Sequence, residues 1–481
     1  MDLKKKALSG AAWKMAERVL AQGISLVVSI ILARLLLPED YGVVSVVAIF
    51  FNFADVIISG GLNSALIQKK DADSDDYSTV FTVSLLISGL LFMLMYILAP
   101  TVARIYKNDL LRPIIRIMGI SLPVYAIKSI ACAYTSANLQ FKKFFFATLG
   151  GTLVSGVVGI VMALSGMGPW ALVAQQITNT AIDTLILFAA TKIKVRFFIS
   201  VKRLKKMFSY GWRILVSSFL GSIYKQVNPL AIGLRFSMSD LSFYTKGRSL
   251  VSVLSTSFTY TLSSVLFPVL SKLQDSKEQM LRGTRHYIRV ASFILFPVMF
   301  GFFAVSDSLV TVLLTDKWLP ASYYVKIFCV AYATDVITVG NCEAVKATGR
   351  SDLFLKIEII KKTLYFINLS LFIAFTDSPR ILVFSEIVNA CIAIAVNMIP
   401  NIKLLGYSMK KQLQDIVPNL IPSLIMCILV SYIGRIEVSA WMTLLIQVIS
   451  GIVIYILACV ATKNKTFSYI LNTVKLHKMG V

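Results

Sequence analysis

Charged residues are scarce in this chain of 481 residues. Asp, Glu, Lys and Arg make up 15% of it, whereas apolar residues make up 57%. Soluble globular domains carry about 25% charged residues, so this chain folded in water would expose large apolar patches. Apolar runs of about 20 residues, the length that crosses a bilayer core as a helix, recur along the sequence. The composition excludes a set of soluble domains and predicts an all-α, polytopic membrane protein.

Histidine and cysteine are rare as well. The chain has 2 His, His286 and His477, both in polar basic segments, and 6 Cys, all in apolar stretches and none in a CxxC pair. Zinc sites and disulfide frameworks need such residues in clusters, so we expect no metal site and no histidine-based chemistry in the membrane. The phosphate-binding pattern GxxxxGK[ST] does not occur, and the predicted outer loops are too short for catalytic residues. We expect neither an enzyme nor a cofactor.

Hydropathy predicts about fourteen membrane-spanning segments. With both termini in the cytoplasm, the inner loops hold about 28 Lys and Arg and the outer loops about 6, as the positive-inside rule requires. A miscount by one span would exchange the sides of all later loops. We therefore predict a multi-pass protein with both ends inside. The spans lie near 12–37, 41–63, 78–101, 113–137, 144–165, 168–190, 209–236, 241–268, 288–314, 321–347, 357–376, 381–402, 416–434 and 438–461.

The formal net charge of +24 follows from this topology. Lys and Arg on the inner face lie against anionic membrane lipid, so nucleic acid is not an expected partner. Residues 192–208 mix cations with Phe197, Phe198 and Phe208. This pattern is typical of an amphipathic segment at the membrane surface.

A weak internal repeat divides the chain. A shift of about 201 residues aligns Arg34 with Arg235 and Glu39 with Asp240, each in a short acidic turn between two spans. Six spans precede the second copy, and because this number is even, both copies enter the membrane from the same side. The repeat therefore predicts two six-helix bundles related by a parallel repeat. The predicted parts are an N-terminal bundle (1–191), a basic amphipathic cytoplasmic linker (192–208), a C-terminal bundle (209–404), and two extra spans with a basic cytoplasmic tail (405–481).

Several predicted spans carry charged and polar residues. A charge at mid-bilayer costs about 2.5–3.5 kcal/mol on insertion scales, so such residues are functional candidates. Asp55 and Asp183 are candidates for carrying a coupling ion. An alternative remains open, in which Glu17 or Asp183 neutralises some of the cations in structural ion pairs. The residues assigned to substrate binding are Arg18, Gln22, Lys128, Lys225, Lys246, Arg248 and Lys346.

Polar stripes on many helices favour a hydrated cleft over a narrow pore. Cations in such a cleft suit an anionic cargo, and hydroxyl and amide groups suit a cargo with many hydrogen-bonding groups, such as sugar. Carrying such groups through hydrocarbon unaided costs several kcal/mol for each one. An apolar drug would instead select an apolar, aromatic-lined pocket.

Several short motifs resemble one family of transporters. Residues 33–42 (ARLLLPEDYG) resemble the end of the first span in bacterial polysaccharide flippases of the Wzx type, which belong to the multidrug/oligosaccharidyl-lipid/polysaccharide exporter superfamily. The exopolysaccharide-exporting branch is the most similar. In the second repeat, residues 239–244 (SDLSFY) lack the glycine usual in this turn. Further similar motifs are residues 61–68, 139–142, 168–176, 267–271, 317–318 and 347–352.

The resemblance implies a function. Such a protein flips undecaprenyl-pyrophosphate-linked oligosaccharide from the inner to the outer leaflet of the bacterial cytoplasmic membrane by alternating access of its two bundles. Glycosyltransferases and a polysaccharide polymerase are the protein partners it implies. Two alternatives remain: a cation-coupled drug or metabolite antiporter of the same fold, and a non-transporting scaffold for polymer assembly.

Overall fold

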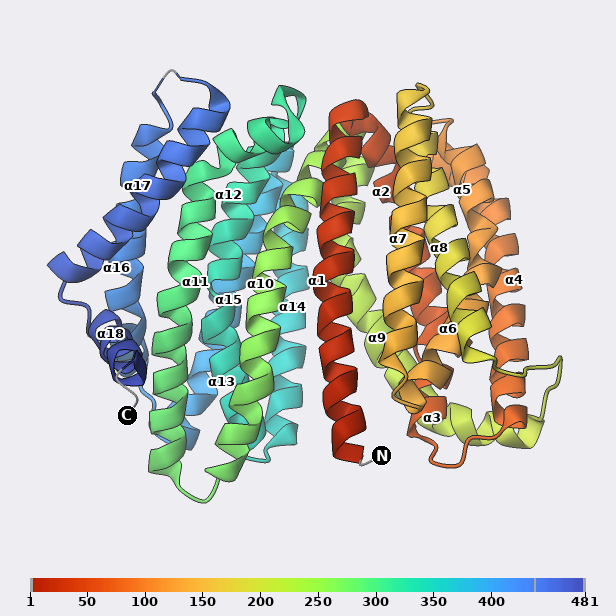
Figure 1. Cartoon of the computed structure of the whole chain (residues 1–481), viewed down its shortest axis with the longest axis horizontal. Helices are drawn as coiled ribbons and strands as arrows, with labels where there is room; N and C mark the ends of the chain where they lie inside the picture. The colour runs from red at the N-terminus through yellow and green to blue at the C-terminus, as the bar shows by residue number, and fades with distance from the viewer. Residues whose placement is uncertain (1–2, 437, 479–481) are drawn as a thin grey trace. The chain divides into compact units, whose positions relative to one another are not determined.

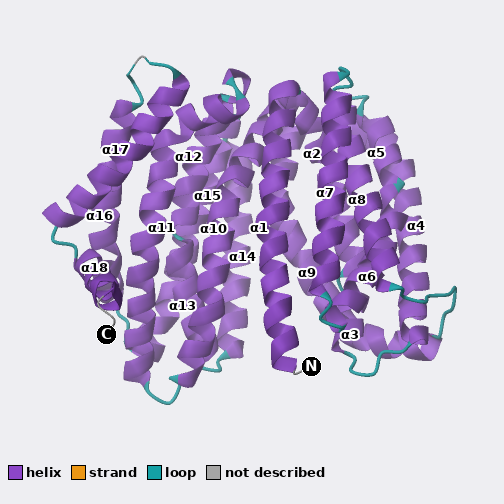
Figure 2. Cartoon of the chain, in the orientation of Figure 1, coloured by secondary structure: helices purple, strands orange, loops and turns teal. Residues whose placement is uncertain are grey.

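The chain is helical throughout the part that the structure describes. The computed structural model covers residues 3–436 and 438–478, with the side chains of residues 3–8, 11, 12, 18, 351 and 473–478 left out. Within these ranges the regular elements are all helices and no strand occurs (Figure 2). The predicted all-α class is confirmed. The chain forms two compact units, Met1–Ser242 and Phe243–Val481.

From residue 3 onward, where the described part of the first unit begins, this unit has nine helices and the first residues of a tenth. Figure 1 labels these helices. α7 packs along both α1 and α8, and α6 packs against α8 and α4. α9 packs against α2, α3 and α4. The helices are α1 (Leu3–Leu35), α2 (Pro38–Ser59), α3 (Leu62–Gln68), α4 (Ser74–Ile105), α5 (Leu111–Gly119), α6 (Ser121–Ala137), α7 (Phe141–Leu164), α8 (Pro169–Thr191) and α9 (Val201–Arg235).

The second unit is organised around a long helix, α11. This helix packs against α12, α13, α16 and α17, and α14 packs against α15. The elements are α10 (Met238–Lys272), which begins in the first unit, α11 (Lys277–Leu314), the 3-10 turn η1 (Asp316–Trp318), α12 (Pro320–Ala333), α13 (Asp335–Ala347), α14 (Ser351–Phe375), α15 (Pro379–Leu405), α16 (Met409–Ile433), α17 (Ala440–Ala461) and α18 (Lys465–Lys478).

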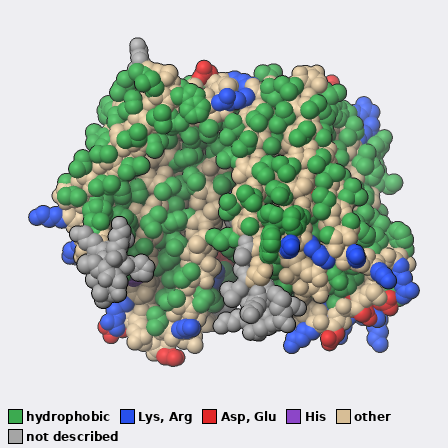
Figure 3. Space-filling view, in the orientation of Figure 1, with side chains coloured by type: hydrophobic (Ala, Val, Ile, Leu, Met, Phe, Trp, Pro, Cys, Tyr) green, Lys and Arg blue, Asp and Glu red, His purple; other side chains and the backbone are tan. Residues whose placement is uncertain are grey.

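Eleven helical segments in the described part are long and apolar enough to cross a membrane. The other three predicted spans, 168–190, 209–236 and 357–376, coincide with α8, α9 and α14, which are helices of similar length but richer in polar and charged residues. Figure 3 shows one face of the molecule, where hydrophobic side chains cover the middle of the helices and most Lys and Arg lie near their ends. This distribution is the one expected of helices embedded in lipid.

The turn between α1 and α2 explains the first family motif. Pro38 occupies the first position of α2, where its fixed φ angle suits a helix and its missing N–H costs nothing. The Asp40 carboxylate accepts a hydrogen bond of 2.9 Å from the N–H of Leu37. A Cβ atom on Gly42 would lie 2.0 Å from the carbonyl oxygen of Met238, so only glycine fits this contact.

The turn before α10 uses the same capping chemistry. The Asp240 carboxylate accepts hydrogen bonds from the N–H (3.3 Å) and hydroxyl (2.6 Å) of Ser237. Asp40 and Asp240 thus have equivalent roles at the starts of two helices, one residue out of step with the predicted pairing of Glu39 with Asp240. Local capping supports the similarity of the two turns, while the division of the chain into repeated bundles stays a prediction.

α9 approaches α3 through two glycines. A Cβ on Gly211 would lie 2.6 Å from the carbonyl oxygen of Gly61, and one on Gly61 would lie 2.8 Å from that of Gly211. The backbones are therefore in direct contact. The sequence predicts that α9 opens the C-terminal bundle, whereas the contacts of the described residues group it with the first unit.

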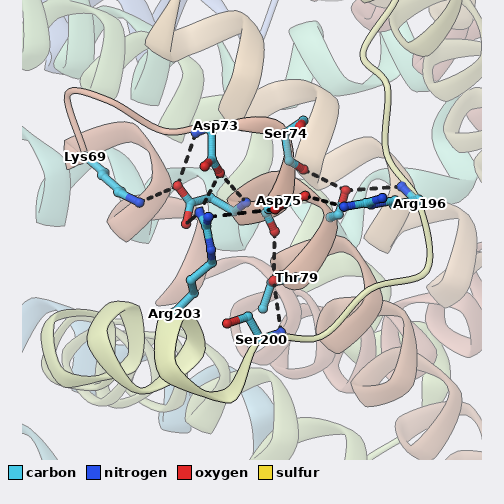
Figure 4. A network of polar contacts seen from close by, with 10 residues as sticks. Lys69, Asp73, Ser74, Asp75, Thr79, Arg196, Ser200 and Arg203 are labelled. Carbon is cyan, nitrogen blue, oxygen red and sulfur yellow. Dashed lines mark hydrogen bonds and ion pairs between the residues drawn. The ribbon is translucent and has the colours of Figure 1, made fainter.

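The predicted linker has two structural parts. After α8 ends, residue Lys192 adopts a left-handed conformation (φ 53°), residues 193–200 form no helix, and the remaining linker residues form the first turns of α9. Figure 4 shows how this stretch is held to the start of α4. The guanidinium of Arg196 lies 2.8 Å from Asp75, and that of Arg203 lies 2.6 Å from Asp73. Ion pairs therefore fasten the middle of the non-helical stretch and the first turn of α9 to the start of α4.

The carboxylates in this network also build the helix start. Asp73 caps α4 by accepting the N–H of Asp76 (2.9 Å), and the Asp76 carboxylate accepts the N–H of Asp73 (3.1 Å). The buried Asp76 carboxylate also contacts Lys69 and Arg203. The hydrogen bond from the Arg203 guanidinium lowers the pKa of Asp73 to about 2. Asp73 is thus held in its charged form at the pH values of a cell.

Candidate functional site

An ion pair links α6 to α8 inside the first unit. The ammonium nitrogen of Lys128 lies 2.6 Å from the Asp183 carboxylate, and their side chains are 23% and 6% exposed. A Cβ on Gly151 of α7 would lie 3.0 Å from the Cβ of Asp183, so this glycine leaves room for the acid. The other Asp183 oxygen, Oδ1, is buried and accepts no hydrogen bond from the residues that the structure describes. The carboxylate is therefore only partly satisfied.

A second charged pair lies on α1, and one thiol interacts with both pairs. Lys14 lies 2.7 Å from Glu17, whose other oxygen accepts a hydrogen bond of 3.3 Å from Thr148 of α7. The Cys132 thiol of α6 interacts electrostatically with both pairs. Four charged groups from α1, α6 and α8 thus lie close together. We call Lys14, Glu17, Lys128 and Asp183 the first-unit charge cluster.

The other predicted residues of the first unit lie on α1, α2 and α9. Asp55 of α2 accepts a hydrogen bond of 3.1 Å from the Ser59 hydroxyl and interacts electrostatically with Tyr125 of α6. Gln22 is exposed on α1, and Lys225 is exposed on α9. Arg18 lies in α1, but its side chain is outside the described residues. The structure thus brings together Lys128 and Asp183 from the predicted set.

A cavity of about 430 Å³ lies beside α2, α7 and α8 of the first unit. The Asn179 amide donates a hydrogen bond of 3.2 Å to the Ser155 hydroxyl in its wall. The motifs at residues 33–42 and 168–176 supply some of the lining residues, whereas Ser155 was not singled out, because single hydroxyls are common in membrane helices. The lining residues are Tyr41, Val44, Ser45, Ala48, Ser155, Leu172, Gln175, Gln176, Asn179 and Thr180.

The second unit buries a separate polar group at the start of α10. The Arg248 Nε atom donates a hydrogen bond of 3.2 Å to the Tyr332 hydroxyl of α12. The Tyr244 hydroxyl donates a hydrogen bond of 3.0 Å to Glu386 of α15. Arg248 interacts electrostatically with Glu386 and Tyr244. Lys246 is buried and lies 5.7 Å from the centre of the Trp318 ring.

Two further ionisable groups of this unit have local partners. The Asp335 carboxylate of α13 accepts a short hydrogen bond from Ser255 of α10. Lys346 lies 2.9 Å from Glu343 one turn earlier in α13. The sequence singled out Lys346 but not its acidic partner Glu343. Arg248 and Lys346 therefore lie beside carboxylate or phenol groups, and Lys246 lies beside an indole ring.

Both polar groups share one chemical property. In the first-unit charge cluster and in the group around Arg248, cations lie against carboxylates or phenol groups. The helices that carry these groups are long and apolar enough to span a membrane, or they lie beside such helices. An ion pair at this depth avoids the cost of an isolated charge. An anion that enters can replace the carboxylate as partner of the cation. Among the described residues, no three His, Cys, Asp or Glu form a group that could hold a metal ion.

The chain is similar to proteins of surface-polysaccharide biosynthesis. It is 23% identical over 65% of its length to the succinoglycan biosynthesis transport protein ExoT of Rhizobium meliloti, of which the match covers 64%. It is 24% identical to the teichuronic acid biosynthesis protein TuaB of Bacillus subtilis, over 73% of each chain. It is 21% identical to the lipopolysaccharide biosynthesis protein WzxC of Escherichia coli, over 76% of this chain and 75% of that one.

The fold is shared with solved transporters. An inward closed structure of the lipid II flippase MurJ matches with a TM-score of 0.74 and 14% identity, over 94% of this chain and 98% of that one. An inward-facing structure of a multidrug resistance transporter of the MATE family matches with a TM-score of 0.61 and 15% identity, over 81% and 96% of the two chains. At these identities the likeness concerns the fold.

A family model matches more than half of the chain. The model described as "Polysaccharide biosynthesis protein" matches residues 31–323. The match begins two residues before the motif at residues 33–42, covers most of the first unit and ends within the second. The family expected from these motifs is confirmed: the chain belongs to the polysaccharide biosynthesis protein family.

Proposed function

We propose that this protein flips undecaprenyl-pyrophosphate-linked oligosaccharide from the inner to the outer leaflet of a bacterial cytoplasmic membrane. The family match over residues 31–323 is the observation that carries the proposal. One relative is named a transport protein of succinoglycan biosynthesis, and one protein of the same fold is a lipid II flippase. In this proposal the lipid tail stays in the bilayer while the charged head and sugars pass along the polar residues of the two units.

The cations of the predicted substrate set supply the chemistry for such a head. A diphosphate binds Lys and Arg through charge-assisted hydrogen bonds. We propose that Arg18, Gln22, Lys128, Lys225, Lys246, Arg248 and Lys346 include the residues that meet it. The carboxylates beside Lys128 and Lys346 keep these cations paired until the substrate arrives, at 2.6 and 2.9 Å. Exchange of a carboxylate for a phosphate then keeps the cation paired, and the displaced carboxylate needs a proton or a cation of its own.

Asp183 is the better of the two candidates for coupling to an ion. Its Oδ1 atom is buried without a hydrogen-bond donor among the described residues, whereas Oδ2 lies against Lys128. A proton or cation taken up at Asp183 would weaken its hold on Lys128 and free the ammonium for the substrate. Asp55, which has Ser59 and Tyr125 as partners, is the second candidate.

The remaining assignments belong to the same proposal. The protein acts as a transporter without a cofactor and performs no covalent chemistry. Both termini lie in the cytoplasm, and anionic lipid faces the basic inner surface. Glycosyltransferases deliver the loaded lipid on the inner side, and a polymerase consumes it on the outer side.

The test is export of surface polymer by a strain that carries the variant Arg18→Gln/Lys225→Gln, with membrane abundance measured in parallel. We expect export to fall at least about tenfold at normal abundance, since each lost charge contact to phosphate is worth about 1.5–3 kcal/mol. Lys202→Gln/Lys206→Gln is the matched control. It removes two exposed charges from the first turns of α9 and should leave export unchanged.

Other outcomes separate the alternatives. Normal export by Arg18→Gln/Lys225→Gln at normal abundance contradicts the assignment of these two cations. A deletion strain with intact polymer and increased drug sensitivity favours a cation-coupled drug or metabolite antiporter of the same fold. Loss of polymer on deletion, with every buried cation replaceable, favours a scaffold.

A further inference from the structure

A basic cavity of about 600 Å³ lies in the second unit, apart from the residues considered above. It lies where the beginnings of α11 and α16 meet the turn from α17 to α18, and α18 contacts α11 (Figure 1). Its lining contains four Lys or Arg and a single carboxylate. These residues are Arg285, His286, Arg289, Val290, Gln414, Asp415, Pro418, Thr462, Lys463, Asn464, Lys465, Thr466 and Tyr469.

The single carboxylate is already saturated. Both oxygens of Asp415 receive hydrogen bonds from the Arg285 guanidinium, at 2.7 and 2.9 Å. Arg289 donates to one oxygen at 2.6 Å, and the buried Tyr407 hydroxyl donates to the other at 2.8 Å. Asp415 therefore cannot neutralise the two lysines of the cavity as well. The cavity keeps an excess of positive charge.

The cavity wall is held in place by amide side chains. Asn464, which is 3% exposed, caps α18 by accepting the N–H groups of Thr466 (2.9 Å) and Phe467 (3.0 Å). Its own amide donates to the carbonyl of Pro418 (2.7 Å) and to Asn419 (3.0 Å). These bonds fix the start of α18 against α16, so that Lys463 and Lys465, which flank Asn464, are carried by a rigid turn.

The remaining charges converge from two directions. Lys463 and Lys465 follow the end of α17, and neither forms an ion pair with a residue in the described ranges. Arg289 comes from α11 and is 45% exposed despite its contact with Asp415. Basic residues that merely mark the cytoplasmic side would point outward separately into the lipid surface. Here they share one wall of a cavity that is large enough for a ligand.

We propose that this cavity binds the phosphate group of an anionic molecule at the membrane surface, with the headgroup of an anionic phospholipid as its source. Guanidinium and ammonium groups are the protein groups that bind phosphate most strongly. Basic pockets between membrane helices on the cytoplasmic side are typical sites for phospholipid headgroups. The cavity lies just beyond the end of the apolar helix α17, at the depth where headgroups lie.

The test uses the purified full chain after delipidation, with phosphatidylglycerol added and bound lipid counted by native mass spectrometry. Each basic residue contributes about 1 kcal/mol to such binding, so Lys463→Gln/Lys465→Gln should weaken it by about 10- to 30-fold. The single variant Lys465→Gln should weaken lipid binding by about fivefold. This variant replaces the double variant in the test if the double variant does not fold. Lys410→Gln/Lys411→Gln is the matched control, because these exposed lysines begin α16 but do not line the cavity.

Two further probes identify the source of the phosphate. Preference for phosphatidylglycerol over phosphatidylcholine, with no displacement by inorganic phosphate, assigns the cavity to a lipid headgroup. Displacement by millimolar inorganic phosphate, with no preference between the lipids, supports the phosphate site but assigns it to a soluble compound. Equal losses in the cavity and control variants, or no loss in either, would overturn the proposal. Because binding is measured without transport, failure here leaves the proposed flippase function untouched.

Discussion

The Lys128 ammonium of α6 lies 2.6 Å from the Asp183 carboxylate of α8. The sequence placed one of these residues in the substrate set and the other among the ion-coupling candidates. Their contact joins the two roles physically, because a change in the charge of Asp183 alters the surroundings of Lys128 directly. It also raises the question of whether the pair serves transport or only stability.

Stability and export of paired variants answer this question. Lys128→Gln leaves the Asp183 carboxylate buried without its counter-ion, which costs up to about 3–5 kcal/mol for a fully buried pair. Lys128→Gln/Asp183→Asn removes both charges, so its unfolding temperature in detergent should lie above that of the single variant. If the pair serves transport, the double variant recovers stability but not export. Recovery of both would assign the pair to structure alone.

The contact of Gly211 with Gly61 predicts a local packing defect. A methyl group on Gly211 would lie 2.6 Å from the Gly61 carbonyl oxygen, so α9 and α3 must separate in Gly211→Ala. Overpacking of this kind costs about 1–3 kcal/mol, which a lowered unfolding temperature would report. Gly221→Ala is the control on the same helix, where a Cβ meets no described atom within 4 Å. It should stabilise α9 by about 0.5–1 kcal/mol, and equal effects of the two variants would contradict the backbone contact.

The helices were predictable because each apolar run of membrane-spanning length must satisfy its own backbone hydrogen bonds. The partners of the charged residues were not. Spacing along one helix shows which residues share a face, as for Lys128 and Cys132, but not which helix that face meets. Glu17 and Asp183 could thus be named as alternative partners of a cation, and only the packing of α6 against α8 selects Asp183 for Lys128.

Contacts between distant segments account for most of what the sequence did not reveal. The linker was recognised as basic and amphipathic, but its attachment to Asp73 and Asp75 joins residues more than a hundred positions apart. The polar cavity beside α8 depends on Ser155, a residue type too common in membrane helices to mark a site. The basic cavity forms from three short stretches, each of which resembles an ordinary positive-inside loop.

Acid should detach the linker from the first unit. Hydrogen bonding to Arg203 holds the pKa of Asp73 at about 2, below its ordinary value of 3.8. A lowered pKa stabilises the folded state above the ordinary value, and this contribution is lost as the pH falls through the pKa of the folded state. We therefore expect the linker to loosen between about pH 4 and pH 2. Pepsin, which is active in this range, should cut increasingly at Phe197 and Phe198.

The variant Arg203→Gln provides the comparison. Without the guanidinium, Asp73 loses the main cause of its lowered pKa, so the linker should already be cut at pH 4 and change less toward pH 2. Cleavage of the protein elsewhere corrects for the pH dependence of pepsin itself. The same rise in cleavage for the wild type and the variant would show that Asp73 and Arg203 do not hold the linker.

The Tyr407 hydroxyl is one of the groups that bind the Asp415 carboxylate, so its removal should lower the stability of the fold. Tyr407 is fully buried, and its hydroxyl donates 2.8 Å to the Asp415 oxygen that also receives Arg285. A hydrogen bond to a charged group contributes about 1.5–3 kcal/mol, so Tyr407→Phe should lower the unfolding temperature although its shape is unchanged. Tyr432→Phe, at a position 60% exposed, should change stability by less than about 0.5 kcal/mol.

Asp415→Asn should cost more stability than Tyr407→Phe, because it leaves Arg285 and Arg289 facing each other without a counter-charge. If Tyr407→Phe is as stable as the wild type, the hydroxyl does not stabilise the Asp415 carboxylate.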